Sequence, residues 1–220
     1  MVDMLKIAID GPAGSGKSTV SKIIAKKLNI NYLDTGAMYR MCTLKVLNEK
    51  IDLDDEKKIT DVIDKIDIKM ENNVFYLDNN DVSELIRDEN ISKNVSKVAA
   101  IKFVREKMVD IQREIATKAD VIMDGRDIGT HVLKESKNKF YLNASIEVRA
   151  ERRYEELINK GANVIKENII EDIAKRDKFD SERENSPLIK ADDAIEIDTS
   201  GLNIEEVVDL IISKIGEKND

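Results

Sequence analysis

The amino-acid sequence predicts a three-layer α/β fold, in which a parallel five-stranded sheet lies between two layers of helices. Five short apolar runs are typical of buried strands, and longer segments with apolar residues at helical spacing separate them. Alternation of this kind forms a mostly parallel sheet with helices on both faces. Over residues 66–88 the alternation is interrupted by runs with a two-residue period, which predict a small antiparallel insert.

The first strand, expected at 5–10, runs into a glycine-rich turn and then a helix. The turn fits the phosphate-binding pattern G-x-x-x-x-G-K-[ST] of a P-loop in the strand–turn–helix context that the pattern requires. Glycines let the backbone approach a ligand closely, and the N–H groups of such a turn bind an anion at the helix N-terminus. We expect Lys17 to contact the β- and γ-phosphates of a nucleoside triphosphate and Ser18 to bind Mg²⁺ through its hydroxyl. The predicted triphosphate site comprises Gly11, Pro12, Ala13, Gly14, Ser15, Gly16, Lys17, Ser18 and Thr19.

A second strand is expected at 31–34, and a helix follows over 37–47. The charged segment 52–66 carries apolar residues at helical spacing, which indicates a surface helix.

The insert contains two alternating runs, 66–70 and 74–77, which predict antiparallel strands. Asn72-Asn73 and residues 78–81 are turn signals, and Val82 opens a possible third strand.

Helices are expected next over 90–99 and 102–117, followed by buried strands at 119–124 and 138–143. The remaining elements are a helix capped by Ser145 and ended by Gly161, a helix over 166–180, a strand over 192–198, and a closing helix that begins with the capping pair Asn203 and Glu206.

Length and composition bound the possible functions. The chain has 220 residues, enough for one domain with small inserts, and its net charge of −8 opposes binding to nucleic acid or to an anionic membrane. With Cys42 as the only cysteine no intrachain disulfide can form, so we expect a cytoplasmic protein with Cys42 as a small buried side chain. His131 is the only histidine, which disfavours a His/Cys metal site. No segment has the length of a membrane span, and none is typical of a secretory signal.

Polar residues that follow the strands predict where an acceptor binds, because ligands of such folds lie at the carboxyl ends of the strands. Asp124 ends a buried strand, as the Mg²⁺-associated aspartate of P-loop enzymes does, although a turn cap is the alternative. Arg126 follows it in Gly-Arg-Asp, and the helical region 149–186 carries further arginines. Arginine neutralises and orients phosphate oxygens, so the pattern favours phosphoryl transfer. The alternative for an arginine on a helix is pairing with a nearby glutamate. The arginines of this region are Arg149, Arg152, Arg153, Arg176 and Arg183.

Four motifs in this order resemble the bacterial cytidylate kinases over essentially the whole chain. They are GPAGSGKST at 11–19, LDTGAMYR at 33–40, DGRDIGT at 124–130 and RDxxDxxR at 176–183. The resemblance implies a single P-loop kinase domain over 1–220 that transfers the γ-phosphoryl group of ATP, with Mg²⁺, to CMP or dCMP in pyrimidine nucleotide metabolism. It also implies that the insert 66–88 serves nucleoside monophosphate (NMP) binding, that 149–186 is a helical lid, and that the protein is a cytoplasmic monomer.

The resemblance also assigns roles to single residues. Cytosine carries an exocyclic amine that the Asp127 carboxylate can accept from, whereas uracil would present a carbonyl there. Arg153 of the lid is expected to bind ATP, and the catalytic residues are expected to be Lys17, Arg126, Arg176 and Arg183. The expected substrate-binding residues are Thr35, Arg40 and Arg126 for the monophosphate, Ser96, Arg105 and Asp127 for cytosine with Arg183 nearby, and Arg176 and Asp180 for the sugar and phosphate.

Three other functions stay open on the residues alone. A P-loop kinase could instead act on AMP, UMP or shikimate. A regulatory GTPase or an ATP-driven switch is disfavoured because the segment 159–162, NKGA, lacks the aspartate of a guanine-binding motif. A nucleic-acid binder is disfavoured by the acidic charge and by an aromatic content of 4%.

Overall fold

The computed structural model describes residues 4–71 and 74–216, so the expected turn at Asn72-Asn73 lies outside the described residues. The chain forms two compact units. One, here called the sheet unit, is made of the described residues up to Tyr32 and from Ala116 onward. The other, the inserted unit, is the continuous stretch 33–115 and is longer than the insert expected from the sequence.

The main sheet has five strands in the order β2-β6-β1-β7-β8. The N-terminal strand β1 is central and pairs in parallel with β6 on one side and β7 on the other, so that Ile9 lies opposite both Asp124 and Phe140. Strand β8 extends the sheet in parallel from β7. These pairings confirm the predicted α/β class with its parallel five-stranded sheet. The strands are β1 Lys6–Asp10, β2 Asn31–Asp34, β6 Val121–Gly125, β7 Asn138–Asn143 and β8 Ile195–Asp198.

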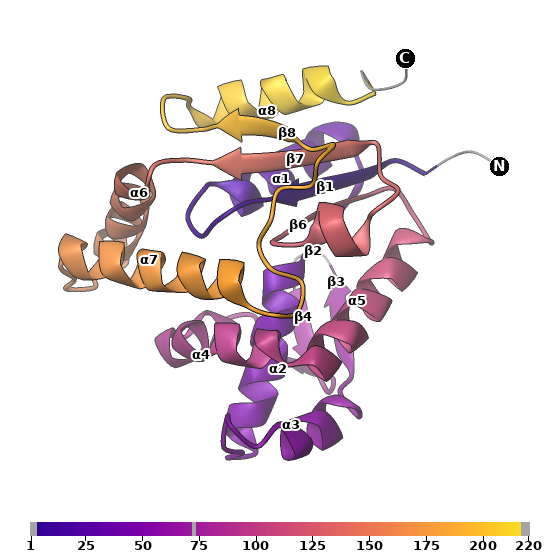
Figure 1. Ribbon diagram of the computed structural model, residues 1–220, viewed down its shortest axis with the longest axis vertical. Coiled ribbons are helices and arrows are strands. Elements are labelled where there is room, and N and C mark those ends of the chain that lie inside the picture. Colours follow the sequence, from indigo (N-terminus) through magenta and orange to yellow (C-terminus); the bar gives the residue numbers. More distant parts are fainter. Residues whose placement is uncertain (1–3, 72–73, 217–220) are drawn as a thin grey trace. The chain divides into compact units, whose positions relative to one another are not determined.

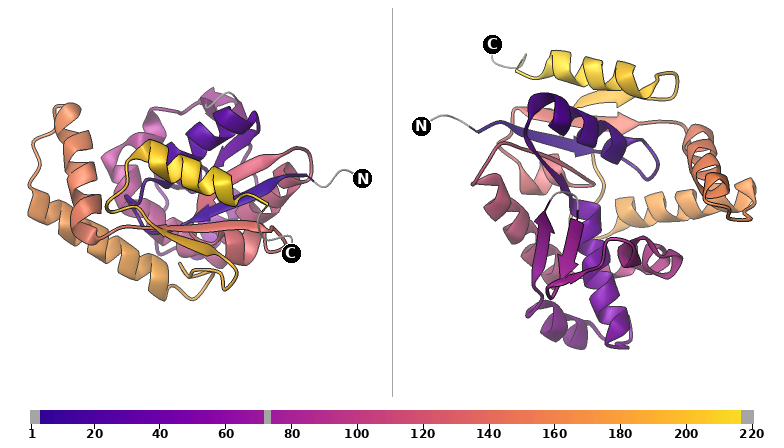
Figure 2. Two further views of the ribbon diagram at one scale, coloured as in Figure 1. Left: turned by 90° about the horizontal axis from the view of Figure 1, so that it is seen from above. Right: turned by 180° about the vertical axis from the view of Figure 1, so that it is seen from behind.

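Two helices of the sheet unit, α1 (Lys17–Leu28) and α8 (Ile204–Lys214), pack against each other and against the strands (Figures 1 and 2). Isoleucines of β1, Phe140 of β7 and Ile211 of α8 share one fully buried core. Burying an aromatic or large aliphatic side chain stabilises a fold by about 1.5–3 kcal/mol, so this cluster fixes α1 and the loop before it on the sheet.

Helices α6 (Ile146–Asn159) and α7 (Lys166–Glu182) lie side by side beyond the end of β7 (Figure 1). They share a small core of their own, with Ala150, Ile169 and Ile173 buried between them. The Ser145 hydroxyl accepts a hydrogen bond from the Val148 N–H at 3.3 Å, which confirms the predicted cap of α6. The capping box of α8 is also present.

The inserted unit is mostly helical with a three-stranded antiparallel sheet in the order β3-β4-β5. Its third strand begins at Asn80 and ends at Asp81, so the expectation that Val82 opens it is wrong. The Asp81 carboxylate accepts hydrogen bonds from the N–H and the hydroxyl of Ser83, which turns the chain away from the strand. The elements are α2 Thr35–Asn48, α3 Glu56–Ile63, β3 Ile68–Glu71, β4 Val74–Leu77, β5 Asn80–Asp81, η1 Leu85–Arg87, α4 Glu89–Ala100 and α5 Lys102–Ala116.

Two further features of the fold bear on the expectations. The surface helix expected over 52–66 is shorter because the Asp55 carboxylate caps α3 by accepting from the Lys58 N–H. Cys42 is fully buried as expected, and burial raises the pKa of its thiol to about 12. None of the helices within residues 4–71 and 74–216 combines the length and apolarity of a membrane span.

Candidate active site

The loop between β1 and α1 can form only with glycine at its key positions. Gly14 and Gly16 have φ of +78° and +89°, in the left-handed region. A Cβ on Gly14 would lie 3.1 Å from the Arg149 Cβ, so the glycine also lets α6 approach the loop. Gly16 is the N-cap residue of α1, and it has no side chain that could accept hydrogen bonds from the N–H groups of the first helical turn. The glycines thus give the loop its backbone conformation, and its binding of an anion stays a prediction.

Lys17 begins α1 and is 6% exposed. Its Nζ donates hydrogen bonds to the Pro12 carbonyl oxygen at 2.6 Å and to Ser15 Oγ at 3.2 Å. Burial, and after it the positive charge of Arg126, hold the pKa of Lys17 well below its ordinary value. The amine is thus turned into the loop, where a bound anion would favour its charged form.

Ser18 and Asp124 come together at the carboxyl end of the sheet, although 106 residues separate them in the chain. The Ser18 hydroxyl donates to Asp124 Oδ2 at 2.6 Å, and the Tyr32 hydroxyl donates to Asp124 Oδ1 at 2.9 Å. Both members of the predicted Mg²⁺ pair thus offer oxygen atoms at one point, the donor chemistry that Mg²⁺ prefers. No group of three or more His, Cys, Asp or Glu side chains that could hold a metal occurs among the described residues.

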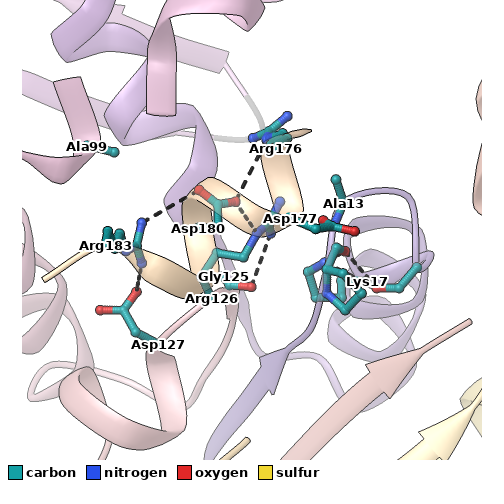
Figure 3. Close-up of polar contacts among 12 residues, drawn as sticks. Ala13, Lys17, Ala99, Gly125, Arg126, Asp127, Arg176, Asp177, Asp180 and Arg183 are labelled. Atoms are coloured by element: carbon teal, nitrogen blue, oxygen red, sulfur yellow. Dashed lines mark hydrogen bonds and ion pairs between the residues drawn. The ribbon is translucent and has the colours of Figure 1, made fainter. Parts of the chain in front are cut away.

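Three of the predicted arginines surround one carboxylate, that of Asp180 on α7 (Figure 3). Arg126 Nε donates to Asp180 Oδ2 at 3.1 Å, Arg176 Nε lies 3.9 Å from that oxygen, and Arg183 Nη1 lies 3.9 Å from Oδ1. Asp180 is 3% exposed. Burial alone would raise the pKa of its carboxyl, but the charges of Arg126, Arg176 and Arg183 hold that pKa below its ordinary value. We call this set the Asp180 cluster.

Arg183 also connects the Asp180 cluster to the loop after β6. Its Nη2 lies 3.7 Å from Asp127 Oδ1, and its Nε donates to the Ser186 carbonyl oxygen at 2.8 Å (Figure 3). Arg183 is 9% exposed and Asp127 3%, so the pair is shielded from water. The structure thus brings together the motif after β6 and the motif on α7.

The two helices α6 and α7 hold the P-loop at Ala13. The Ala13 N–H donates to Asp177 Oδ1 at 3.1 Å, and Arg149 Nη1 donates to the Ala13 carbonyl oxygen at 2.9 Å. Arg149 Nη1 also donates to Asp177 Oδ2, and Arg149 Nε is fixed by the Ala144 carbonyl oxygen at 2.9 Å. Both polar groups of one loop residue are therefore bound by side chains of the predicted lid.

Neighbouring arginines of α6 have different surroundings. Arg153 is 41% exposed at its side chain and pairs with Glu156 at 2.7 Å, so its predicted contact with ATP stays a prediction. Arg152 donates to the Thr199 carbonyl oxygen at 2.7 Å, and its Nη1 lies 3.9 Å from where a Cβ on Gly16 would be. Arg152 thus approaches the P-loop at Gly16.

The predicted monophosphate residues of the inserted unit lie on α2. Thr35 is its first residue and is 2% exposed, and Asp34 caps the helix by accepting from the Ala37 N–H at 2.9 Å. Arg40 donates to Ser92 Oγ at 2.8 Å and to the Ile86 carbonyl oxygen at 3.3 Å. The fold therefore holds both side chains in place within this unit.

The predicted cytosine-binding residues of the inserted unit lie on α4 and α5. Arg105 is 3% exposed, donates to the Ala99 carbonyl oxygen at 3.0 Å, and stacks its guanidinium 5.1 Å from the ring centroid of Tyr39. Ser96 is half-buried on α4. A buried arginine fixed by a backbone oxygen and an aromatic ring is a rigid donor, which suits recognition of a planar base.

Sequence reasoning did not predict the contacts that five residues of the sheet unit make: Asp10, Tyr32, Arg149, Arg152 and Asp177. Asp10 directly precedes the P-loop and Asp177 follows Arg176 in a recognised motif, so both positions were in view. The partners of these residues are distant in the chain, and no local sequence pattern predicts such a contact.

Known proteins resemble this chain over nearly all its length. A family model described as cytidylate kinase matches residues 7–217. A cytidylate kinase of Clostridioides difficile strain 630 is 54% identical over 211 residues, which cover 96% of this chain and 98% of that protein. A cytidylate kinase of Bacillus subtilis strain 168 is 50% identical over 223 residues and 100% of both chains. The crystal structure of an uncharacterized protein from Eubacterium ventriosum has a TM-score of 0.53 at 16% identity, covering 97% of this chain and 98% of that one, a likeness of fold.

Proposed function

The chain belongs to the cytidylate kinase family and is a phosphotransferase, and from this premise we propose that it transfers the γ-phosphoryl group of ATP to CMP and dCMP. The products are ADP and CDP or dCDP, intermediates of pyrimidine nucleotide metabolism. The observation that carries the proposal is the Asp180 cluster, in which three arginines gather in a protein of net charge −8. Phosphoryl transfer depends on such neutralisation of charge more than on covalent help from the enzyme.

The P-loop is the proposed site of the ATP phosphates. Its glycines and the N-terminus of α1 supply backbone N–H groups, and Lys17 supplies a cation that is already within the loop. Ser18 and Asp124 would hold Mg²⁺, the second through water, and phosphate oxygens and water would complete the shell. When bound, Mg²⁺ neutralises charge on the β- and γ-phosphate oxygens. The oxygen atoms of Ser18 and Asp124 suit a hard cation such as Mg²⁺. Separately, we expect Arg153 to contact ATP.

The transfer needs no general base from the protein, because the attacking atom is an oxygen of the anionic CMP phosphate. A bond forms between that oxygen and the γ-phosphorus, and the bond from the γ-phosphorus to the β–γ bridging oxygen breaks. The electron pair of the broken bond leaves with ADP. Lys17, Arg126, Arg176 and Arg183 would stabilise the charge that develops on the phosphoryl oxygens.

Recognition of the acceptor is proposed to depend on the residues that the family resemblance indicates. Thr35, Arg40 and Arg126 would bind the monophosphate, and Arg176 and Asp180 the sugar and phosphate. For cytosine we propose hydrogen bonds from the exocyclic amine to Asp127 and from Ser96 and Arg105 to the carbonyl oxygen and ring nitrogen. The firm hold of Arg105 by Ala99 and Tyr39 supports this role.

The domain roles follow the same proposal. We take 1–220 as one kinase domain and assign NMP binding to the insert 66–88, with 149–186 as a lid that excludes water during transfer. The separate small core of α6 and α7 supports a lid that moves as one body. A monomeric protein in the cytoplasm is the state that we propose.

The test is a coupled assay of ADP release with CMP, dCMP, UMP, AMP and GMP as acceptors. We expect turnover to be highest with CMP or dCMP. We also expect Lys17→Ala to abolish it while the protein stays folded, and Lys26→Ala, an exposed lysine of the same helix, to leave it unchanged. Highest turnover on AMP, or rapid ATP hydrolysis without any acceptor, would contradict the proposed reaction.

A further inference from the structure

Asp10 is the last residue of β1 and directly precedes the P-loop, and its carboxylate is bonded to the backbone that follows β6. Oδ1 accepts a hydrogen bond from the Ile128 N–H at 2.8 Å, and Oδ2 accepts one from the Gly129 N–H at 2.7 Å. Two consecutive backbone amides, 118 and 119 residues further along the chain, are thus bound by one side chain. Bonds of this length to an ionised acceptor are charge-assisted.

The carboxylate of Asp10 is buried, which is costly for a charged group. Asp10 is 4% exposed, and burial raises the pKa of its carboxyl to about 6 although the N–H groups of Gly129 and Ile128 lower it. Asp198, which accepts from the Ser200 N–H at a turn, is exposed to water, whereas Asp34, which caps α2, is buried but accepts from a residue only three positions away.

The two amides that Asp10 binds lie directly after residues proposed to bind the acceptor. Ile128 and Gly129 follow Arg126 and Asp127 directly, and Arg126 and Asp127 are two side chains assigned above to the acceptor nucleotide. Gly129 lies close to Asp10, since a Cβ there would make an ordinary contact of 3.4 Å with Asp10 Oδ2. One carboxylate therefore joins the start of the P-loop to the end of the Gly-Arg-Asp turn.

We propose that Asp10 is a positioning residue that fixes the backbone after Asp127 against the end of β1 and thereby holds Arg126 and Asp127 in place for the acceptor. This role rests on the proposed function of those two residues. An asparagine cannot replace Asp10, because its amide keeps one acceptor oxygen but turns an NH₂ donor toward the second N–H. A glutamate has the charge but one more methylene group than the buried space is built for.

The experiment compares Asp10→Asn with Asp120→Asn in the full-length protein. Asp120 is a matched control, since it also accepts a backbone N–H in this sheet, from Leu5 at 2.8 Å, but at the amino end of β6. We expect Asp10→Asn to lower kcat/KM for CMP by about tenfold to a hundredfold, the range for loss of one hydrogen bond to a charged group. KM for ATP should stay near its wild-type value, and Asp120→Asn should change neither.

A second readout does not depend on activity. Hydrogen exchange of the Ile128 and Gly129 amides should be faster in Asp10→Asn, whereas the amides of α1 should keep their protection. If Asp10→Asn does not fold, Asp10→Glu, which keeps the charge but displaces the carboxylate by one methylene group, should shift the CMP parameters in the same direction.

The outcomes separate this inference from the proposed function. If wild-type protein does not phosphorylate CMP, the proposed function fails, and the exchange data still decide whether Asp10 fixes the turn. If CMP is a substrate but Asp10→Asn leaves both kcat/KM for CMP and the two exchange rates unchanged, the positioning role is wrong. An equal loss toward ATP and CMP would also overturn it, because the effect would then belong to the P-loop as a whole.

Discussion

Replacing Gly11 by alanine should destabilise the protein far more than the same replacement at Gly161. At Gly11 the backbone has φ of +147°, and a Cβ would lie 2.0 Å from the Leu142 carbonyl oxygen in β7. At Gly161, which ends α6, φ is +79° and no heavy atom lies within 4 Å of the added Cβ. Both sites therefore have a positive φ that disfavours alanine, but only at Gly11 would the added Cβ collide with another part of the chain.

The magnitude follows from the distance that has to be recovered. A Cβ–oxygen contact of ordinary length, 3.4 Å, requires a shift of 1.4 Å, the difference from 2.0 Å. Leu142 is fully buried and its strand pairs with β1 through Asp10 and Tyr141, so the shift separates the ends of two central strands. Positive-φ strain costs about 1–3 kcal/mol, and loss of about two backbone hydrogen bonds at about 1 kcal/mol each adds about 2 kcal/mol, which gives about 3–5 kcal/mol for Gly11→Ala. Gly161→Ala should cost about 1–2 kcal/mol, the strain alone.

The assay is urea unfolding of both variants beside the wild type, with the free energy of unfolding compared at equal m-values. Kinase activity should be lost in Gly11→Ala and retained in Gly161→Ala, because only the first change displaces the P-loop. If Gly11→Ala is no more destabilising than Gly161→Ala, the close approach of the loop to β7 is not a constraint on the fold.

Three further outcomes are expected. Asp127→Ala should raise KM for CMP more than KM for ATP in steady-state kinetics, and an equal rise would argue against base recognition at this residue. Because the pKa of Asp180 is lowered in the folded protein, its ion pairs stabilise the fold above the unfolded value of 3.8, and this stabilisation is lost as the pH falls through the lower folded value. Urea unfolding below pH 4 should thus depend less on pH in Asp180→Asn, and an unchanged slope would mean that other carboxylates dominate. Asn203→Ala should cost about 1 kcal/mol through loss of the α8 capping box and lower Tm by about 2–4 °C in calorimetry, whereas an unchanged Tm would show that the box contributes nothing.

Features with a local cause could be predicted from the sequence. The P-loop, the cap at Ser145 and the capping box at Asn203 depend on residues within a few positions of one another, so a linear pattern contains them. The buried strands β1, β6 and β7 were recognisable as apolar runs because a strand covered on both faces has no polar side. That Ser18 and Asp124 lie close together could be predicted because the carboxyl ends of parallel strands share one edge of the sheet.

Features with a distant cause could not be predicted. The bond between Ala13 and Asp177 spans 164 residues and leaves no trace in either local sequence. Arg152 and Arg153 are adjacent and of one type, and the turn of α6 alone decides that Arg152 reaches Thr199 while Arg153 pairs with Glu156. The third strand of the insert ends at Asp81, before the expected Val82, because the Asp81 side chain bonds the backbone N–H of Ser83. Strand propensity does not take such a side-chain-to-backbone hydrogen bond into account.

The central place of β1 in the sheet has a consequence for synthesis on the ribosome. Lys6 pairs with Val121, so the first strand to be made waits for 115 more residues before its nearest partner exists. At 5–20 residues per second this wait lasts roughly 6–23 seconds. The inserted unit is one continuous stretch that is complete by residue 115, before any partner of β1 has emerged. Each nascent chain therefore exposes an apolar strand, KIAID, throughout the making of the inserted unit, and a pause in that stretch lengthens the interval in which β1 can pair with a neighbouring chain.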